Sequence, residues 1–359
     1  MAYKSISQSC LGVIRIGMST IAVSQVCFKK AFAPVLSRFI GRFMPNQIDT
    51  VHLTRLGTSD LYVSRVGLGC WPMSGISSLG ITDELSIATI HSALDHGVNF
   101  FDTAYSYGYN GRSDRVLGQA LRTNRDRAVI AHKVGSHWDE KKQRVVDGRP
   151  ETLFSQAQEC LSRLGMDHVD VMYLHTPDPL VPIEESANAI AEICKRGWAR
   201  YAAVSNVNLE QATRFAAVCP VVAIQPYFNL FQQEAVRELL PFVFPNNISL
   251  VCYWVLMKGL LSGRLKRDHV FDPADRRLAY PIFQGEAWQR AQNVLDKLRH
   301  LANELDYTVA QLVVAWSLTQ PGISVALLGA KRPEQIAESV QAMHIKLDAD
   351  VIEQINAFL

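Results

Sequence analysis

The feature that most constrains this chain is a regular alternation of short apolar runs with amphipathic runs, which starts at Val66 and continues almost to the end. The apolar runs have the length of buried strands, and the runs between them have helical periodicity. Strands are expected at 66–69, 98–102, 128–132, 169–174, 200–205, 221–225, 248–253 and 323–328. Helices are expected near 83–96, 114–122, 151–163, 184–196, 208–217, 233–240, 286–305, 308–319 and 333–342.

Eight strands, each followed by a helix, predict an α/β fold with a parallel sheet, and this number of units favours closure into a (β/α)8 TIM barrel. Residues 52–65 form two short alternating runs around Gly57-Thr58-Ser59-Asp60, which predicts an N-terminal β-hairpin. The segment 264–285 after the seventh strand is too long for a packed connection, so we expect a mobile flap over the functional site. No Gly-x-Gly-x-x-Gly follows an early strand, which argues against a Rossmann domain.

The first fifty residues differ from the rest because no acidic residue occurs before Asp49, while basic and apolar residues alternate. The run from Ile16 to Phe28 is too short and too interrupted to span a membrane. Two interpretations stay open: a targeting segment, or a disordered extension or early start upstream of Met44. We therefore expect an extension at 1–50 and a barrel domain at 51–359, in a cytoplasmic protein unless residues 1–44 direct it elsewhere.

Composition narrows the class of protein. Hydrophobic content of 48% and charged content of 19% are typical of a globular protein with a large core. A net charge of +2 leaves no basic surplus for nucleic acid. The seven cysteines are scattered and contain no C-x-x-C, which indicates free thiols in a reducing compartment, without a disulfide framework or metal site.

Polar side chains stand at the carboxyl ends of six successive strands, the end where barrels keep their active sites. Each alone has a structural explanation: Lys133 as a solvated strand end, Asn206 as a helix cap, Tyr253 as a core residue. Six such coincidences at one end of a barrel are improbable, so we expect these residues to form a single functional site at the carboxyl end of the strands, which we call the mouth. Its members are Asp102 and Tyr107, Lys133, His175, Ser205 and Asn206, Gln225, and Tyr253.

These motifs resemble those of the aldo-keto reductase family over residues 52–359. The matching segments are Asp102-Thr-Ala-x-x-Tyr107-Gly, Lys133, Tyr173-x-His175, Ser205-Asn206, Gln225 with Phe228-Asn-Leu, Gly259-Leu-Leu-x-Gly263, and Gly329-Ala-Lys-Arg-Pro-Glu-Gln-Ile-Ala-Glu338. The resemblance implies a (β/α)8 barrel that binds a nicotinamide dinucleotide and transfers a hydride between its C4 and a carbonyl carbon. The chain departs from many relatives at Tyr253-Trp254-Val255-Leu256 and at Glu338-Ser339, both on the cofactor side.

Carbonyl reduction needs a proton for the developing alkoxide, and a phenol with a pKa of about 10 is a poor donor unless a neighbour favours the phenolate. We expect Tyr107 to be this acid, with Lys133 beside it as the activating cation and Asp102 as the counter-charge of that lysine. His175 is expected to donate to the substrate oxygen and to orient it. The reaction needs no metal.

Amide and hydroxyl groups at Ser205, Asn206 and Gln225 match the nicotinamide carboxamide, and Tyr253 can stack on the ring. At the other end, Lys331 and Arg332 suit a 2′-phosphate and favour NADPH over NADH, unless they are only an exposed helix cap. Gln335 and Glu338 lie one turn apart and would reach the adenine. The full set of expected cofactor contacts is Cys70, Trp71, Asp102, Ser205, Asn206, Gln225, Tyr253, Leu256, Gly263, Arg264, Gly329, Lys331, Gln335, Glu338 and Ser339.

Two other functions remain open: a sugar or polyol dehydrogenase that uses NAD, and a non-catalytic subunit that senses the cofactor for a partner. Because Asp102, Tyr107, Lys133 and His175 are all present, the non-catalytic subunit is the least favoured. Together with Lys331 and Arg332, they lead us to expect an NADP(H)-dependent oxidoreductase acting on an aldehyde, ketone or sugar. Specificity is expected to lie in Trp71, in His137 and Trp138 after the third strand, and in the flap. The identity of the carbonyl substrate and the oligomeric state are left open.

Overall fold

The computed structural model describes residues 13–16, 19–22, 52–78, 80–273 and 275–359. The chain divides into two units, residues 1–50 and 51–359. In the first unit, strands β1 (Val13–Ile16) and β2 (Ser19–Ala22) pair antiparallel. The interpretations of residues 1–50 otherwise lie outside the described residues.

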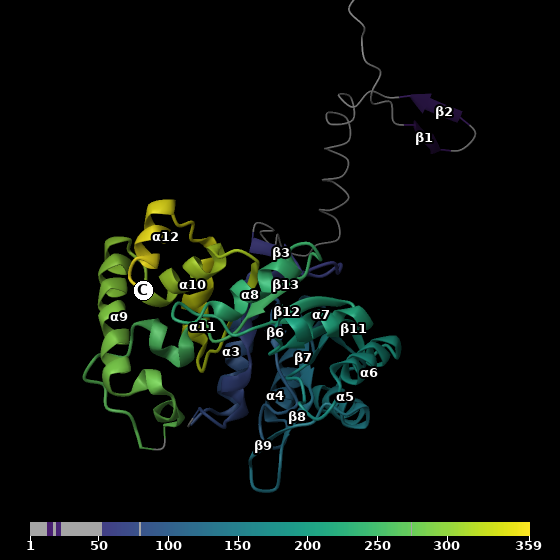
Figure 1. The fold of residues 1–359 in the computed structure, drawn as a ribbon, viewed down its shortest axis with the longest axis horizontal. Helices are drawn as coiled ribbons and strands as arrows, with labels where there is room; N and C mark the ends of the chain where they lie inside the picture. Colours follow the sequence, from purple (N-terminus) through teal and green to yellow (C-terminus); the bar gives the residue numbers. More distant parts are fainter. Residues whose placement is uncertain (1–12, 17–18, 23–51, 79, 274) are drawn as a thin grey trace, which may run out of the picture. The chain divides into compact units, whose positions relative to one another are not determined.

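Eight parallel strands form a closed barrel, as the alternation of the sequence predicts (Figure 1). In chain order they are β5 (Val66–Gly69), β6 (Phe100–Asp102), β7 (Val129–Val134), β10 (Val169–Leu174), β11 (Ala199–Ser205), β12 (Val221–Gln225), β13 (Ser249–Cys252) and β14 (Ile323–Leu328). Closure comes from β14 pairing with β5, where Ala326 aligns with Val66 and Leu328 with Leu68. The (β/α)8 fold class is therefore confirmed.

Helices connect successive strands and surround the barrel (Figure 1). Their apolar faces pack on the outer side of the strands and form the larger of the two core clusters. The last helix of the alternation packs beside the first and completes the ring. The helices are α3 (Asp83–Asp95), α4 (Arg112–Leu121), α5 (Pro150–Leu164), α6 (Ile183–Lys195), α7 (Leu209–Val218), α8 (Glu234–Val243), α9 (Gly285–Glu304), α10 (Val309–Thr319) and α11 (Pro333–Val340).

The predicted hairpin consists of β3 (Leu53–Arg55) and β4 (Tyr62–Ser64), and it closes the amino end of the barrel. Leu56, Leu61 and Val63 are buried in the interior cluster with inward-facing strand residues. The turn fits closely, because Gly57 has φ +55° and a Cβ there would overlap the carbonyl oxygen of Val222. Gly57 N–H also donates to Ser249 Oγ at 2.8 Å. The opposite, carboxyl end of the barrel is left for the functional groups.

The elements not predicted from the sequence include a hairpin and a helix of the barrel domain. A hairpin of β8 (Ser136–Trp138) and β9 (Arg144–Val146) follows β7 and extends from the barrel (Figure 1). Helix α12 (Ala349–Asn356) follows α11 near the end of the chain. The hairpin matters most, because it starts at the carboxyl end of a barrel strand.

The long segment after β13 contains the short helices η4 (Met257–Ser262), η5 (Arg276–Ala279) and η6 (Pro281–Phe283). It packs on the start of α9 through the rings of Phe271, Phe283 and Trp288. Trp288 Nε1 donates to the carbonyl oxygen of Arg267 at 3.0 Å. The predicted flap is thus a folded arm of the barrel domain, and its mobility stays a prediction.

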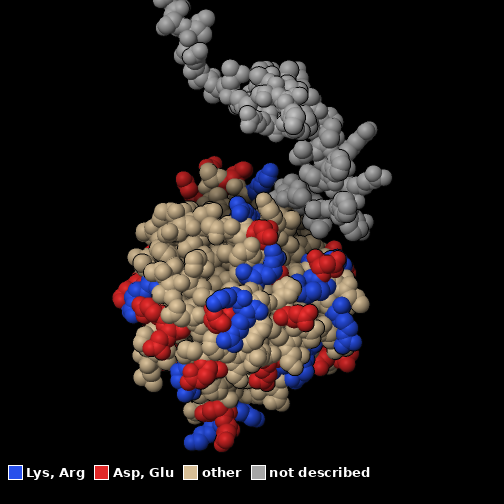
Figure 2. All heavy atoms as spheres, turned by 90° about the vertical axis from the view of Figure 1, so that its right-hand side faces the viewer, with Lys and Arg blue, Asp and Glu red and all other residues tan. Residues whose placement is uncertain are grey.

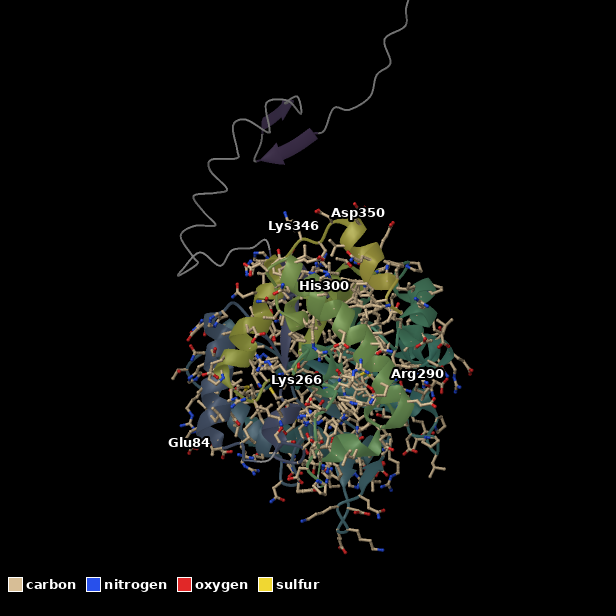
Figure 3. All side chains as sticks on the ribbon, turned by 90° about the vertical axis from the view of Figure 1, so that its left-hand side faces the viewer. Glu84, Lys266, Arg290, His300, Lys346 and Asp350 are labelled. Atoms are coloured by element: carbon tan, nitrogen blue, oxygen red, sulfur yellow. The ribbon has the colours of Figure 1, made fainter. Side chains whose placement is uncertain are left out.

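Charged side chains of both signs are interspersed on the face that Figure 2 shows. The residues labelled in Figure 3, among them Glu84, Arg290 and Lys346, are exposed on the outer helices and loops. None of the helices in the described part of the chain has the length and hydrophobicity needed to cross a bilayer. Five cysteines in the barrel domain are free thiols: Cys70, Cys160, Cys194, Cys219 and Cys252.

Candidate active site

Four polar residues from three strand ends and one loop meet at the carboxyl end of the barrel. Lys133 Nζ lies 2.5 Å from Asp102 Oδ1 and 3.2 Å from Tyr107 Oη. The ring of His175 lies edge-on to Tyr107, with centroids 6.0 Å apart. The four residues singled out at strand ends are therefore neighbours in space.

The loop that carries Tyr107 is shaped by the strand before it and the helix after it. Thr103 N–H and Tyr105 N–H donate to the carbonyl oxygens of Ala131 and Lys133, so the loop continues the pairing with β7. At Gly108 the backbone has φ +105°, and a Cβ would lie 2.9 Å from the backbone nitrogen of Arg112. Only glycine allows this close approach to the start of α4, which sets Tyr107 facing the mouth.

Lys133 is a buried cation with one close counter-charge. Its side chain is 1% exposed, and that of Asp102 is 3% exposed. Burial by itself would lower the pKa of Lys133, but Asp102 and Tyr107 outweigh it, and the pKa is raised. Lys133 therefore keeps its positive charge next to the phenol.

Opposing effects act on Tyr107. Burial raises the pKa of its phenol, Lys133 lowers it, and Asp102 adds to the rise, so that the net shift is upward. The effect that Lys133 was expected to have is present, but burial is larger. Tyr107 is consequently a protonated phenol near neutral pH and can donate, with the ammonium ready to stabilise the phenolate that donation leaves.

His175 has a cation on its outer side that the sequence did not indicate. Arg144 Nη2 lies 2.9 Å from His175 Nε2. Because a guanidinium only donates, Nε2 must be the acceptor, which assigns the imidazole proton to Nδ1. Burial, followed by Arg144, lowers the pKa of His175 well below its ordinary value, so the ring is neutral.

The residues expected at the nicotinamide are linked to this group by hydrogen bonds. Gln225 Nε2 donates to Asp102 Oδ2 at 2.8 Å, and Ser205 Oγ donates to the carbonyl oxygen of Gln225 at 2.9 Å. Asn206, at φ +59°, donates to the carbonyl oxygen of His175 and accepts from Tyr253 Oη at 2.7 Å. One polar lining therefore runs from Asp102 to Tyr253.

The residues expected at the adenosine end gather around the start of α11. Arg264 forms an ion pair with Glu338, and Gln335 Oε1 accepts from Lys331 N–H at 2.8 Å. Gly263 and Gly329 have packing reasons to be glycine, because added Cβ atoms would press on Val309 and Pro72. Ser339 is buried and Leu256 is partly buried beside η4.

A third basic residue, Arg277 of η5, belongs to the same region. Burial lowers the pKa of Lys331, and the nearby charges of Arg277 and Arg332 lower it further, against Asp275. Arg277 is itself held by Asp275, with Nη2 2.6 Å from Oδ2. Arg277 lies in the long segment after β13, more than fifty positions before Lys331, so sequence spacing gave no signal for it.

Residues 65–359 match the model of the Aldo/keto reductase family. The chain belongs to this family. As a member of this family the chain is an oxidoreductase, and aldo-keto reductases use nicotinamide cofactors and act on small carbonyl substrates.

Among its relatives is aldo-keto reductase YhdN of Bacillus subtilis, 34% identical, with 85% of this chain and 93% of the relative covered. A probable voltage-gated potassium channel subunit beta of Arabidopsis thaliana is 34% identical, with 84% and 95% covered. The NADH-specific methylglyoxal reductase of Escherichia coli is 31% identical, with 82% and 94% covered. Among solved structures, glycerol dehydrogenase AKR11B4 from Gluconobacter oxydans has a TM-score of 0.80 and 32% identity, with 86% and 95% covered.

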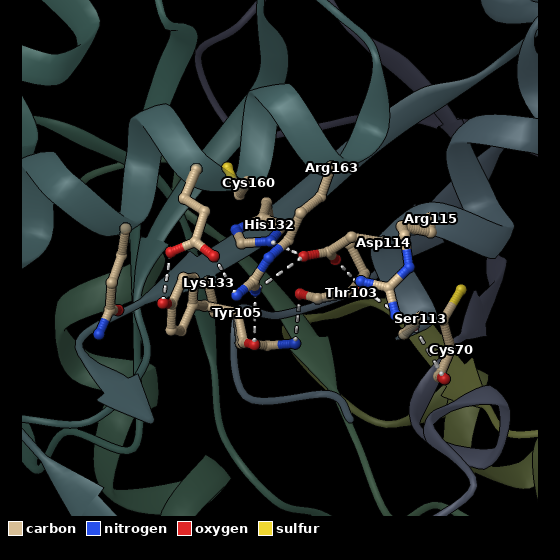
Figure 4. A network of polar contacts seen from close by, with 12 residues as sticks. Cys70, Thr103, Tyr105, Ser113, Asp114, Arg115, His132, Lys133, Cys160 and Arg163 are labelled. Atoms are coloured by element: carbon tan, nitrogen blue, oxygen red, sulfur yellow. Dashed lines mark hydrogen bonds and ion pairs between the residues drawn. The ribbon is translucent and has the colours of Figure 1, made fainter. Parts of the chain in front are cut away.

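Behind the mouth, this aldo-keto reductase has a buried polar network that supports the Tyr107 loop (Figure 4). Asp114 Oδ1 accepts from Thr103 Oγ1 at 2.8 Å, and its Oδ2 lies 3.3 Å from His132 Nε2. Ser113 Oγ donates to the carbonyl oxygen of Cys70 at 3.2 Å. The network ties the ends of β5, β6 and β7 to α4, so the Cys70 thiol is buried in the support of the mouth.

The residues expected to determine specificity lie around the Tyr107 loop. Trp71 is edge-on to Tyr107 with centroids 5.2 Å apart. Trp138 Nε1 donates to the carbonyl oxygen of Ser106 at 2.7 Å. His137 and Trp138 line a cavity of about 440 Å³ together with Tyr105 and Arg163. None of Asp102, Tyr107, Lys133 and His175 lines that cavity, so it lies beside the mouth.

Proposed function

We propose that this aldo-keto reductase reduces a small aldehyde or ketone with NADPH, using Tyr107 as the general acid. The observation that carries the proposal is the position of Lys133 Nζ, which touches both Asp102 and Tyr107 inside a buried site. A buried ammonium held between a carboxylate and a phenol has a clear chemical use, because it stabilises the phenolate formed when Tyr107 gives up its proton.

In the reducing direction, the carbonyl oxygen of the substrate lies within reach of Tyr107 Oη and receives its proton as negative charge develops. Lys133 stabilises the resulting phenolate, and Asp102 keeps Lys133 charged and in place. In the oxidising direction the same phenolate accepts the proton of an alcohol. A donor role for His175 toward the substrate oxygen requires Nε2 to give up its contact with Arg144 and the imidazole proton to move from Nδ1 to Nε2.

A nicotinamide coenzyme would supply or accept the hydride. The residues that suit its ring are Ser205, Asn206, Gln225 and Tyr253, whose hydrogen bonds connect them to Asp102. Glu338 and Gln335 suit its adenine. Lys331 and Arg332 suit its 2′-phosphate, since neither forms an ion pair with a described residue and Arg277 adds a further charge nearby. This grouping supports NADPH as the coenzyme.

A second candidate is an NAD-dependent dehydrogenase of sugars or polyols. It gains weight from the glycerol dehydrogenase and the NADH-specific reductase among the proteins to which this chain is similar. Because the chain is similar to a probable potassium channel subunit beta, a non-catalytic subunit that senses the cofactor is a third candidate. The intact group around Lys133 ranks the non-catalytic subunit below the reductase. The basic cluster around Lys331, which suits a 2′-phosphate, ranks the NAD-dependent dehydrogenase below it.

The test is a coenzyme and substrate screen with the full chain. Purified protein is assayed with NADPH and NADH against aldehydes, ketones and sugars, and with NADP⁺ and NAD⁺ against polyols. We expect reduction with NADPH at the highest kcat/KM. A higher kcat/KM for polyol oxidation with NAD⁺ would establish the second candidate, and coenzyme binding without turnover would establish the subunit.

We also propose a cytoplasmic location, which localisation of the tagged full chain would test.

A further inference from the structure

The hairpin β8–β9 brings a cation to the catalytic group. Arg144 begins β9, opposite Trp138 of β8. Its Nη2 contacts His175 Nε2 at 2.9 Å and donates to Ser136 Oγ at 3.3 Å. Arg144 is thus anchored at one end of its guanidinium, next to the histidine that faces Tyr107.

Unlike Lys133 and Arg149, Arg144 has no counter-charge among the residues that the structure describes. Lys133 is paired with Asp102, and on the same stretch of chain Arg149 is paired with Asp147. Lys142 lies over the ring of Tyr109. Arg144 forms no ion pair with any residue that the structure describes. The mouth therefore has an uncompensated positive charge on its His175 side.

The remaining donors of Arg144 are the right ones for an oxyanion. A guanidinium has five N–H groups, and both printed contacts of Arg144 use Nη2, which carries two of them. Three donors are left, on Nη1 and Nε. Each of these can donate a charge-assisted hydrogen bond to a carboxylate or phosphate oxygen.

We propose that Arg144 binds a carboxylate or phosphate oxyanion carried by the substrate itself. The preferred substrates are then short aldehydes or ketones with an anionic group two or three carbons from the carbonyl carbon. A short spacing is expected because Arg144 contacts His175, whose ring centroid lies 6.0 Å from that of Tyr107. This inference rests on the proposed function, and it adds the substrate class and a specificity-determining residue.

The carboxylate arm of the test compares 4-oxobutanoate with its methyl ester, which has the same aldehyde and no charge. With NADPH, wild-type protein should show a kcat/KM about ten- to a hundredfold higher for the acid, as a charge-assisted contact provides. In Arg144→Met this ratio should fall to about one. Arg144→Lys keeps the charge but not the planar arrangement of donors, and should retain an intermediate ratio.

The matched control is Lys141→Met, which removes one positive charge from the same hairpin at an exposed position. Its acid-to-ester ratio should equal that of the wild type. An equal fall in the control would show that the general field of the hairpin, and not Arg144, selects the acid.

The phosphate arm compares glyceraldehyde 3-phosphate with glyceraldehyde in the same variants. If kcat/KM depends on the anionic group and on Arg144 in the phosphate arm alone, the oxyanion is a phosphate. If it does so in the carboxylate arm alone, the oxyanion is a carboxylate. Ratios near one in both arms for the wild type would overturn the proposal while leaving the reductase function intact.

Calorimetry separates this proposal from the one on which it rests. Dissociation constants for 4-oxobutanoate and glyceraldehyde 3-phosphate are measured with wild type and Arg144→Met in the presence of NADP⁺. Binding that depends on Arg144 without any turnover would support the oxyanion site and contradict the reductase. Turnover of the neutral aldehydes, with anion binding unchanged in Arg144→Met, would support the reductase and contradict the oxyanion site.

Discussion

At the scale of single residues, the balance of forces on Tyr107 decides what the site can do. Burial keeps the phenol protonated, and Lys133 stabilises the phenolate once the proton has left.

The sequence predicted the positions of Asp102, Tyr107, Lys133 and His175, because each lies at or just beyond the end of a predicted strand. Arg144 was not readable, since only the fold of an unpredicted hairpin brings it back to His175.

The pKa directions predict the pH profile. Because the pKa of Tyr107 is raised, its acid form persists through neutral pH, and reduction should be independent of pH until about 10, the ordinary pKa of tyrosine, and fall above it. Because the pKa of His175 is lowered, no inflection should appear near its ordinary value of about 6.5. Oxidation, which needs the phenolate, should rise with pH. The measurement is kcat for reduction and for oxidation as a function of pH. A kcat for reduction that falls between pH about 6 and 7 would contradict the assignment of Tyr107 as the acid.

At the scale of elements, periodicity predicted the eight strands and nine helices to within a few residues, because buried strands and amphipathic helices differ in their spacing of apolar residues. The hairpin β8–β9 has only three residues in each strand, too few for a periodic signal. Helix α12 is short and follows the last strand of the alternation, so nothing in the repeat required it. How the first hairpin closes the barrel also depends on contacts between distant segments.

Gly57 tests that closure. Gly57→Ala puts a Cβ against the backbone of Val222 at a positive φ, so the free energy of unfolding should fall by at least about 2 kcal/mol. Gly97→Ala is the matched control, because Gly97 has φ +84° and no atom within 4 Å of the added Cβ. It should cost only about 1 kcal/mol. Urea unfolding measures both, and equal losses would mean that the hairpin does not pack tightly into the barrel.

The loop between β14 and α11 should determine coenzyme choice. Lys331→Ala should raise KM for NADPH about tenfold or more and leave that for NADH almost unchanged, since NADH has no 2′-phosphate for the lysine to bind. Added salt should reduce the wild-type preference, because the site is partly exposed. Lys346→Ala, at an exposed lysine beyond α11, is the control and should change neither value. Equal losses for both coenzymes would show that Lys331 is structural.

At the scale of the whole molecule, residues 51–359 form one unit with its own core and all the proposed catalytic residues. A chain that begins at Met44 should therefore fold and turn over substrate as the full chain does. Thermal unfolding and kcat/KM for both chains provide the measurement. Insolubility or loss of activity of the shorter chain would show that the first residues contribute to the barrel or its site.

The central claim is that Tyr107 gives the proton that accompanies hydride transfer, and Tyr107→Phe tests it most directly. Loss of a general acid lowers the rate about a hundred- to ten-thousandfold. The measurement is single-turnover oxidation of bound NADPH by an aldehyde, together with the dissociation constant for NADPH. We predict this loss in rate with a dissociation constant within about twofold of the wild type, since Tyr107→Phe removes none of the residues proposed to hold the coenzyme. A Tyr107→Phe protein that transfers hydride at the wild-type rate would contradict the account.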